Sequence, residues 1–234
     1  MNLTDLITIP EYTLTLPISK EKVKYRPFLV KEQRVLLQSQ EENDEKQQIS
    51  SMISILKACT YGKVNVESMN VTDFEYLLLN IRSKSAGSNI QINIPCDSCG
   101  HANEIDLSIE DIKLTENEKV DNPIMISEGF YIEMQFPSTE SLLDYDKTSK
   151  GEQTLSIVKT CLKSIIHNDS VYPLENYSEE KISEFIDQLT SEQLTKLIKF
   201  IESMNTNYLP KEFNCVKCGE KNSRKFEGLL ELFT

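Results

Sequence analysis

The stretch Cys96-Asp97-Ser98-Cys99-Gly100-His101-Ala102-Asn103 recurs near the C-terminal end as Cys215-Val216-Lys217-Cys218-Gly219-Glu220-Lys221-Asn222. Both copies follow the pattern Cys-x-x-Cys-Gly-x-x-Asn, and we call each copy a knuckle. Two cysteines three positions apart in a tight turn can direct both thiolates at one metal ion, and the glycine lets the chain reverse past it. Each knuckle therefore supplies half of a tetrahedral metal site.

Together the two knuckles predict one structural zinc site with four ligands: Cys96, Cys99, Cys215 and Cys218. The 115 residues between the halves far exceed the about 15 to 20 of a local zinc ribbon, so the ion would join distant parts of the chain. Four thiolates leave no open position for water, which favours a structural over a catalytic Zn²⁺. His101 is an alternative ligand, and two metal-free dithiols are the alternative to a metal site.

Composition restricts the class of protein. The net charge of -12 over 234 residues argues against a surface for nucleic acid or anionic membrane, because phosphate binding needs clustered Lys and Arg. No apolar run approaches the about 18 residues of a membrane span, and no secretory signal pattern is present. We therefore expect a protein that works in a cytosol, where cysteines bind metal more often than they form disulfides. Cys59 and Cys161, outside the knuckles, are expected to be inert core residues.

Nothing in the sequence supports catalysis. The chain has two histidines and seven glycines, with no phosphate-cradling loop and no Gly-x-Ser-x-Gly elbow. His167 is predicted to lie at the end of an apolar helix, and the acidic clusters are typical of solvated loops and first helical turns. We expect no catalytic residues and no enzyme activity.

Hydrophobic periodicity predicts an α+β fold with a helix-rich core and short β-hairpins. Because a knuckle is too small to bury a core alone, we expect residues 1–234 to form a single compact unit. Its expected parts are an N-terminal hairpin (10–30), a helical part (31–86), the first zinc knuckle (89–108), a hairpin with helices (120–207), and the second knuckle with a tail (208–234).

Several helix boundaries follow from local patterns. Thr72 with Glu75, and Thr190 with Gln193, have the spacing of capping boxes at helix starts. Pro137 to Glu140 is expected to open a further helical region. One apolar stripe at helical spacing predicts a helix that continues past residue 161: Leu155, Val158, Cys161, Leu162 and Ile165.

The segment Lys22-Val23-Lys24-Tyr25-Arg26-Pro27-Phe28-Leu29-Val30-Lys31-Glu32-Gln33, followed by Leu36-Leu37, resembles the opening of the T4-type phage baseplate proteins, the baseplate hub assembly family of contractile-tailed phages. The similarity continues in the helix Asp73 to Ser85, in the knuckle directly after it, and in the second knuckle followed by Phe226-Glu227-Gly228-Leu229. These landmarks span nearly the whole chain in the same order.

The resemblance implies a phage protein made in the bacterial host cytoplasm that helps to assemble the central hub of a contractile-tail baseplate. Its partners would be other phage tail or hub proteins, and its final location is either the assembly intermediate or the virion baseplate. The competing class is a zinc-ribbon protein that binds nucleic acid or regulates transcription, which would crowd basic residues on the knuckles. The apolar tail Phe226 to Phe233 would either enter a partner's groove as a helix or pack on the protein's own core.

Overall fold

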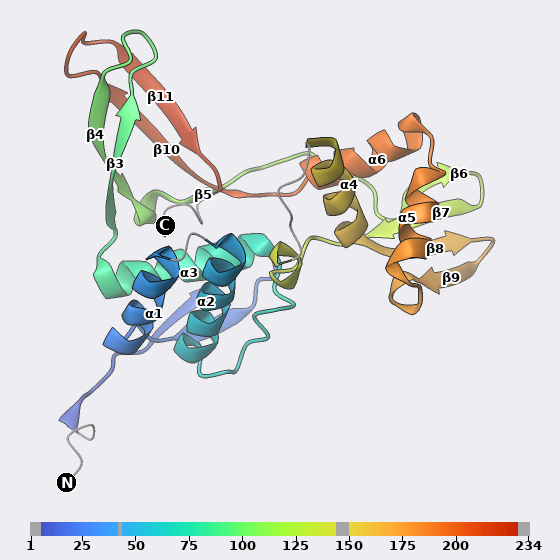
Figure 1. Ribbon diagram of the computed structural model, residues 1–234, viewed down its shortest axis with the longest axis horizontal. Coiled ribbons are helices and arrows are strands. Elements are labelled where there is room, and N and C mark those ends of the chain that lie inside the picture. The colour runs from blue at the N-terminus through green and yellow to red at the C-terminus, as the bar shows by residue number, and fades with distance from the viewer. Residues whose placement is uncertain (1–5, 42–43, 144–149, 229–234) are drawn as a thin grey trace. The chain divides into compact units, whose positions relative to one another are not determined.

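The computed structural model describes residues 6–41, 44–143 and 150–228, and the chain divides into two compact units (Figure 1). Unit 1 comprises Met1–Thr115 together with Thr206–Thr234, and unit 2 comprises Glu116–Asn205. The described chain mixes six α-helices with small antiparallel sheets, as the α+β prediction required. The expectation that 1–234 behaves as a single compact unit stays a prediction, because a spatial division does not measure whether the parts unfold together.

Unit 1 combines three helices with three hairpins. The first hairpin pairs β1 (Tyr12–Thr15) with β2 (Lys22–Tyr25), and the helices are α1 (Val30–Glu41), α2 (Glu45–Cys59) and α3 (Val71–Ala86). The knuckle hairpins pair β3 (Asn89–Pro95) with β4 (Ala102–Ser108), and β10 (Asn207–Asn214) with β11 (Lys221–Phe226). These elements lie at the segments expected for the N-terminal hairpin, the helical part and the two knuckles.

Helix α3 is the centre of the unit 1 core. Five of its apolar side chains are fully buried: Phe74, Leu77, Leu78, Leu79 and Ile81. Helix α2 contributes four buried side chains to the same core: Met52, Ile53, Ile55 and Leu56. A helix that is apolar on most sides is typical of the middle of a core, so α3 provides the platform on which the other elements of unit 1 pack.

The predicted capping box at the start of α3 is wrong. Asn70, two residues before Thr72, caps the helix, and its side chain accepts a hydrogen bond from the N–H of Asp73 at 2.9 Å. Asp73 is itself fully buried and accepts hydrogen bonds from the backbone N–H groups of Ile18 and Ser19, at 2.8 and 2.9 Å. The first turn of α3 therefore holds the turn of the N-terminal hairpin.

A buried ion pair lies in the Tyr25-Arg26-Pro27-Phe28 motif. The Arg26 guanidinium donates to Glu32 Oε1 at 2.9 Å and to the Pro27 carbonyl at 2.9 Å. It also lies 3.7 Å from the sulfur of buried Cys59 in α2. The motif that carried the family resemblance thus fixes α1 against α2 through a charged group in the interior.

The chain leaves unit 1 and returns to it at one place. Strand β5 (Lys113–Leu114) pairs with the start of β10. Just beyond this pair, Thr115 N–H donates to the Thr206 carbonyl at 2.9 Å, and Thr206 N–H donates to Thr115 Oγ1 at 2.8 Å. Unit 2 is therefore inserted in the chain between β5 and β10, and the two unit 1 residues that flank it, Thr115 and Thr206, are joined by reciprocal hydrogen bonds.

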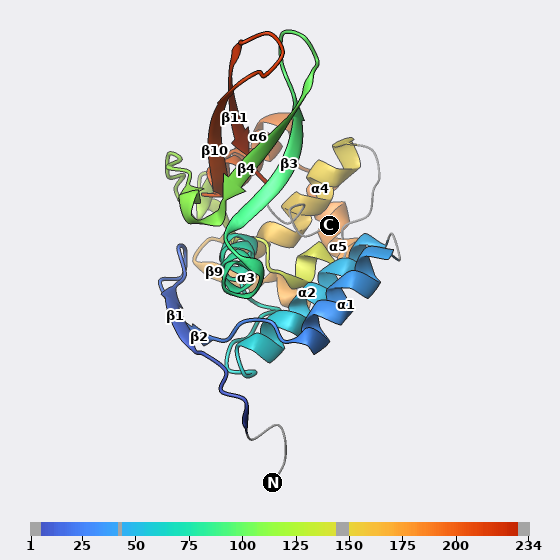
Figure 2. The same ribbon diagram turned by 90° about the vertical axis from the view of Figure 1, so that its left-hand side faces the viewer.

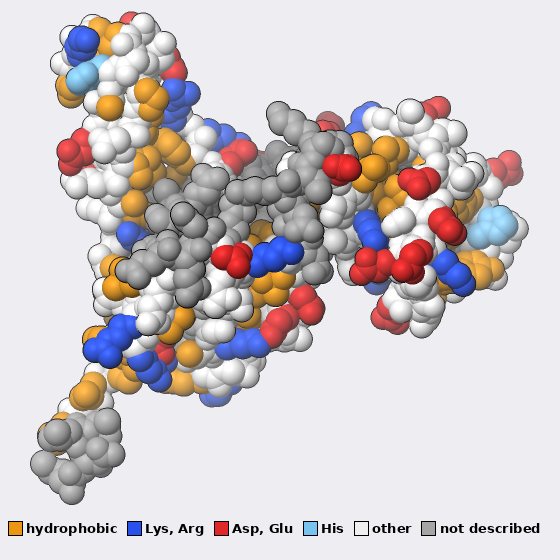
Figure 3. Space-filling model, in the orientation of Figure 1, with side chains coloured by type: hydrophobic (Ala, Val, Ile, Leu, Met, Phe, Trp, Pro, Cys, Tyr) orange, Lys and Arg blue, Asp and Glu red, His pale blue; other side chains and the backbone are white. Residues whose placement is uncertain are grey.

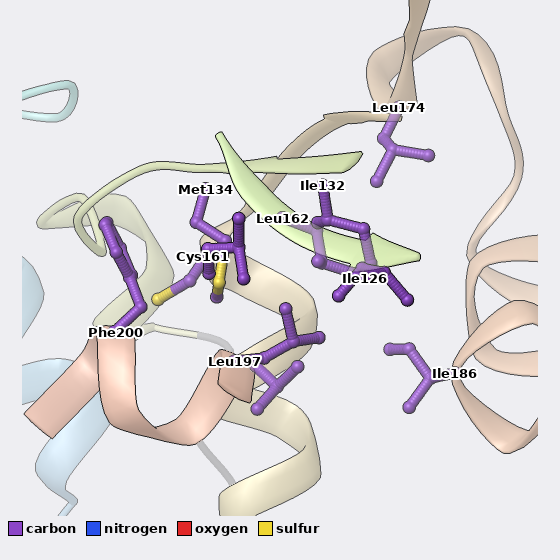
Figure 4. Close-up of a cluster of buried hydrophobic side chains, with 11 residues drawn as sticks. Ile126, Ile132, Met134, Cys161, Leu162, Leu174, Ile186, Leu197 and Phe200 are labelled. Atoms are coloured by element: carbon purple, nitrogen blue, oxygen red, sulfur yellow. The ribbon is translucent and has the colours of Figure 1, made fainter. Parts of the chain in front are cut away.

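Unit 2 is a four-stranded antiparallel sheet with three helices. The sheet order is β6 (Ile124–Ser127), β7 (Phe130–Met134), β8 (Leu162–His167) and β9 (Ser170–Pro173). The helices are α4 (Lys150–Cys161), α5 (Glu179–Asp187) and α6 (Ser191–Glu202). Figure 4 shows the core, where Ile126 and Ile132 of the sheet gather with Leu197 and Phe200 of α6. The Thr190–Gln193 capping box at the start of α6 is confirmed.

One helix prediction in unit 2 is wrong. Helix α4 ends at Cys161, and the rest of the predicted stripe lies in strand β8, so His167 ends a strand and not a helix. Asn168 and Asp169 both have positive φ, 47° and 64°, which is the geometry of a two-residue hairpin turn that Asn and Asp tolerate. The helical region expected to open at Pro137 to Glu140 begins with a 3-10 helix, Glu140–Leu142, and residues 144–149 after it lie outside the described part of the chain.

The C-terminal tail is described only as far as Gly228. Phe226 pairs with Leu209 in the β10–β11 hairpin, so it does not lie on a helical face as predicted. The remaining tail positions of that prediction, Leu229 to Phe233, lie outside the described residues. Among the described helices, none is both long enough and apolar enough to span a bilayer.

Candidate metal centre

The two knuckles are the end turns of two hairpins in unit 1 that lie side by side, as Figure 1 and Figure 2 show. The turns have the same hydrogen bonds. Cys96 N–H donates to the His101 carbonyl at 2.9 Å, and Gly100 N–H donates to the Cys96 carbonyl at 3.0 Å. In the second turn, Cys215 N–H donates to the Glu220 carbonyl at 2.8 Å, and Gly219 N–H donates to the Cys215 carbonyl at 2.9 Å. The repeated sequence has therefore folded into a repeated local structure.

The glycine after the second cysteine is required by this turn. Gly100 has φ +67° and Gly219 has φ +76°, in the left-handed region that side chains with a Cβ rarely adopt. This conformation sends the chain back into the return strand while both cysteines stay on the inner side of the turn.

The structure brings the four predicted cysteines together. Their sulfur atoms all lie within 4.8 Å of one another, and Cys96 Sγ to Cys218 Sγ and Cys99 Sγ to Cys215 Sγ are each 3.7 Å. A tetrahedron of sulfur ligands about 2.3 Å from a zinc ion has edges of about 3.8 Å. The donor set and its spacing therefore fit a tetrahedral metal ion, and both 3.7 Å contacts link one knuckle to the other.

Backbone N–H groups prepare the first cysteine of each knuckle to bind a cation. The N–H of Cys218 points to the Cys215 sulfur and, with further donors, lowers the pKa of Cys215 to about 6. The N–H of Cys99 lowers the pKa of Cys96 in the same way. At Cys218 the N–H of Glu220 favours the thiolate, but the neighbouring sulfur atoms outweigh it and raise the pKa to about 12. Four thiolates this close need a cation to ionise together.

The two cysteines of each knuckle differ in exposure. Cys96 and Cys215 are buried, at 3% exposure each, whereas Cys99 and Cys218 are exposed. With four thiolates in the set, a bound ion would have no free position for substrate. The arrangement can join the two hairpins.

Two asparagines that the sequence analysis gave no role cross-link the knuckles. Asn103 Oδ1 accepts the N–H of Val216, and Asn222 Oδ1 accepts the N–H of Asp97, both at 2.9 Å. Each asparagine also donates to its own turn, Asn103 to the His101 carbonyl at 2.8 Å and Asn222 to the Glu220 carbonyl at 2.9 Å. Both are 1% exposed. Both asparagines occupy the last position of the repeated motif, and this repetition was the signal in the sequence that they have a common role.

The basic residues of the second knuckle hairpin are mostly paired. Arg224 forms an ion pair with Asp97 of the first knuckle. Lys221 pairs with Glu212 at 2.7 Å, and Lys225 pairs with Glu227 at 2.6 Å. These pairs neutralise side chains that a nucleic-acid site would leave free for phosphates.

The other sequence-predicted candidates lie away from this cluster. Among the described residues, the group of metal-ligating atoms contains the four cysteines and not His101. Cys59 and Cys161 are fully buried, and burial raises the pKa of each thiol to about 11. Their predicted place in the core is confirmed, and their lack of reactivity stays a prediction.

Comparisons with known proteins identify the family. Residues 9–234 match the model of the T4 bacteriophage base plate protein family, which covers both units and both knuckles. Comparisons with curated proteins and with solved structures gave no significant match. Because the family model matches nearly the whole chain, the chain belongs to the T4 bacteriophage base plate protein family.

Proposed function

We propose that this base plate protein acts in the assembly of the central hub of a contractile-tail base plate, through contacts with other tail or hub proteins. The match of residues 9–234 to the base plate family carries this proposal. Hub assembly is the finer role implied by the resemblance of the Arg26-Pro27-Phe28 opening and of the helix before the first knuckle.

The proposed cofactor is one structural Zn²⁺ ion held by Cys96, Cys99, Cys215 and Cys218. When bound, the ion supplies a cross-link between the β3–β4 and β10–β11 hairpins. The support is chemical: the donor set is four cysteine sulfur atoms, two of its edges are 3.7 Å and fit zinc-sulfur bonds of about 2.3 Å, and no oxygen donor is among the grouped atoms.

A protein with this role needs rigid surfaces and no catalytic residues, so the proposed activity is non-enzymatic. The proposed place of action is the bacterial host cytoplasm, where tails assemble, with the virion base plate as the final location if the chain stays in the particle. The knuckles, the buried ion pair and the Asp73 anchor all serve to hold a fixed shape.

The alternative of a nucleic-acid-binding zinc ribbon has less support. The observation that most favours it is a cluster of basic residues on the second knuckle hairpin: Lys217, Lys221, Arg224 and Lys225. Three of these four side chains are in ion pairs with acidic residues of the same unit. Affinity for DNA at physiological salt that falls as salt is raised would favour this alternative over hub assembly.

The test is to purify the chain with an affinity tag from infected cells and to identify its partners by mass spectrometry. Stoichiometric recovery of hub proteins supports the proposal, whereas recovery of none of them refutes it. Mass spectrometry of finished virions then distinguishes an assembly factor from a component of the particle.

A further inference from the structure

The sheet of unit 2 has two faces, and one of them carries a row of apolar side chains. Strand pairing places Met125 of β6 opposite Tyr131 of β7, Tyr131 opposite Ile166 of β8, and Ile166 opposite Val171 of β9. Residues directly opposite one another on neighbouring strands lie on the same face. We call these four residues the outer row.

The outer row faces away from the core. Ile124 and Ile126 flank Met125 in β6, and both belong to the buried cluster, as does Ile132 next to Tyr131. Successive side chains of a strand point to opposite faces. Figure 4 shows Ile126 and Ile132 directed to the interior, so their neighbours in the outer row lie on the opposite face of the sheet.

The outer row is accessible along its length. Met125 and Val171, at its two ends, are 58% and 59% exposed, and the two residues between them are partly exposed. Four strands about 4.8 Å apart give a row about 14 Å long. A single exposed apolar residue needs no explanation, but a continuous row across a sheet is typical of an interaction surface.

A hollow adjoins one end of the row. Val171 also lines a cavity of about 590 Å³, together with Lys163, Glu175 and Tyr177. Its lining is mixed, with the apolar side chains of Val171, Leu174 and Tyr177 beside charged ones. A partner side chain placed beside Val171 could enter this space.

The charge of unit 2 indicates which partner fits. Residues 116–205 carry 17 Asp and Glu against 8 Lys, so they account for nine of the twelve net negative charges of the chain. Exposed Glu128 and Asp169 occupy the two hairpin turns at one end of the sheet, beyond the outer row. Figure 3 shows acidic side chains spread over the visible face of unit 2. A second copy of this unit would be repelled, and a basic surface would be attracted.

We propose that the outer row is the docking surface for a neighbouring base plate protein that presents apolar side chains surrounded by Lys and Arg. The inference rests on the proposed function, because it assigns the surface through which that function operates. The apolar row supplies the buried centre of the interface, and the acidic turns supply its rim.

The test uses the full chain and separately purified base plate hub proteins of the same phage. The variant Met125→Asp with Val171→Asp places charges in the interface centre and is expected to weaken binding at least about tenfold. The matched control is Val30→Asp, because Val30 is 65% exposed in unit 1 and begins α1, where an acidic residue suits the helix N-terminus. The control should bind like the wild type.

A second pair of variants tests the sign of the partner's charge. Glu128→Lys should weaken binding and reduce its dependence on salt, because it removes an attractive rim charge. The control, Glu21→Lys, makes the same charge change at an exposed position of the N-terminal hairpin in unit 1. Stronger binding by Glu128→Lys would overturn the inference that the partner surface is basic.

The failure of this proposal differs from the failure of the proposed function. If the wild type binds no hub protein, the proposed function fails. If it binds one and the outer-row variants bind equally well, the docking surface is wrong and the function stands. A dimer of the wild type that these variants abolish would make the occupant a second copy and overturn the proposal.

A crosslinking measurement covers variants that fail to fold. A photoreactive amino acid at position 171 of the otherwise unchanged chain is expected to form an adduct with a hub protein in the complex, at a segment rich in Lys and Arg. A complex in which position 171 gives no adduct, while other positions of the chain do, refutes the docking surface.

Discussion

Asn222 accepts a hydrogen bond at 2.9 Å from the backbone N–H of Asp97, which precedes it by 125 residues in the chain. Asn103 makes the reciprocal bond with the N–H of Val216. Each knuckle therefore holds the other through its asparagine. These hydrogen bonds align the two turns, and the alignment brings the four cysteine sulfur atoms together.

The asparagine bonds are expected to stabilise unit 1 and to strengthen metal binding. Asn103→Ala leaves the Val216 N–H without its partner, which should cost about 1 to 3 kcal/mol of unfolding free energy. The matched control is Asn93→Ala, because Asn93 is an exposed residue of the adjoining strand β3. Chemical denaturation and competition with a chelator measure the two effects.

The conservative variant Asn103→Asp separates the two functions of the amide. It keeps the oxygen that accepts from Val216, but it removes the donor to the His101 carbonyl and adds a negative charge near the thiolates. We expect a loss of metal affinity at least as large as that of Asn103→Ala. Equal metal affinity for the wild type, Asn103→Ala and Asn103→Asp would show that Asn103 does not support the site.

The metal content of the chain should be one zinc ion. Elemental analysis of freshly purified, reduced protein is expected to give one zinc per chain, and X-ray absorption should give zinc-sulfur distances of about 2.3 Å. Cys96→Ser should lose the ion and much of the stability, because the ion closes a loop of more than a hundred residues. Two zinc ions per chain would show that the knuckles bind metal separately, and none would refute the site.

The grouping of the four cysteines could be predicted from the sequence because its signal is local and repeated. Two equal motifs, each with two ligands, lead to one four-ligand site without knowledge of the fold. The bonds from Asn103 to Val216 and from Asn222 to Asp97 could not be predicted in this way. They depend on how the two hairpins lie against each other, and a pattern within one knuckle does not contain that information.

The errors in the predicted fold have the same origin. Apolar residues at helical spacing suggested one helix through Ile165, but pairing of β8 with β7 and β9 prevails over local periodicity. The Asn168-Asp169 pair was a hairpin signal that the helical interpretation overlooked. At α3, two nearby residues could serve as cap, and the bonds from Asp73 to the distant N-terminal hairpin favour the start at Asn70.

The Arg26–Glu32 pair should make stability fall in acid. Both side chains are nearly buried, at 7% and 6% exposure. Burial raises the pKa of Glu32, but hydrogen bonds from Arg26 and the Leu29 N–H outweigh it and hold the pKa below its ordinary value. The stabilisation is therefore complete above the unfolded pKa of about 4.3, and it is lost as pH falls through the lower folded pKa.

Glu32→Gln tests this pair. At pH 7 it should cost about 3 to 5 kcal/mol, because it leaves the Arg26 charge buried without a counter-ion. The difference from the wild type should shrink below about pH 4. The control Glu212→Gln breaks a largely exposed pair with Lys221 and should cost less than about 1 kcal/mol. Denaturation curves over a range of pH measure both, and a pH-independent difference contradicts the assignment.

Asp73 should be essential for holding the N-terminal hairpin. Asp73→Ala removes an acceptor for two backbone N–H groups, and a bond to a charged acceptor is worth about 1.5 to 3 kcal/mol. Hydrogen exchange should speed up at the amides of Ile18 and Ser19, which donate to this carboxylate. Asp111→Ala, in the exposed end of a 3-10 helix, serves as the control. Unchanged exchange at both amides would contradict the anchor.

Limited proteolysis tests whether the chain behaves as a single compact unit. Cleavage is expected first at Gln40 to Lys46 or at Thr115 to Asp121, where the sequence is polar and lacks apolar periodicity. The second segment contains the boundary between unit 1 and unit 2. If 1–234 is one unit, the fragments should stay associated and melt together. A fragment that separates and remains folded would show independent domains.

The insertion of unit 2 between β5 and β10 has a consequence for synthesis. A ribosome releases Cys96 and Cys99 before any residue of unit 2 and releases Cys215 and Cys218 only after all of it. The first pair of thiols must therefore stay reduced and without its partners while 115 residues are translated. Closure of the four-cysteine cluster therefore requires that all of unit 2 has been made.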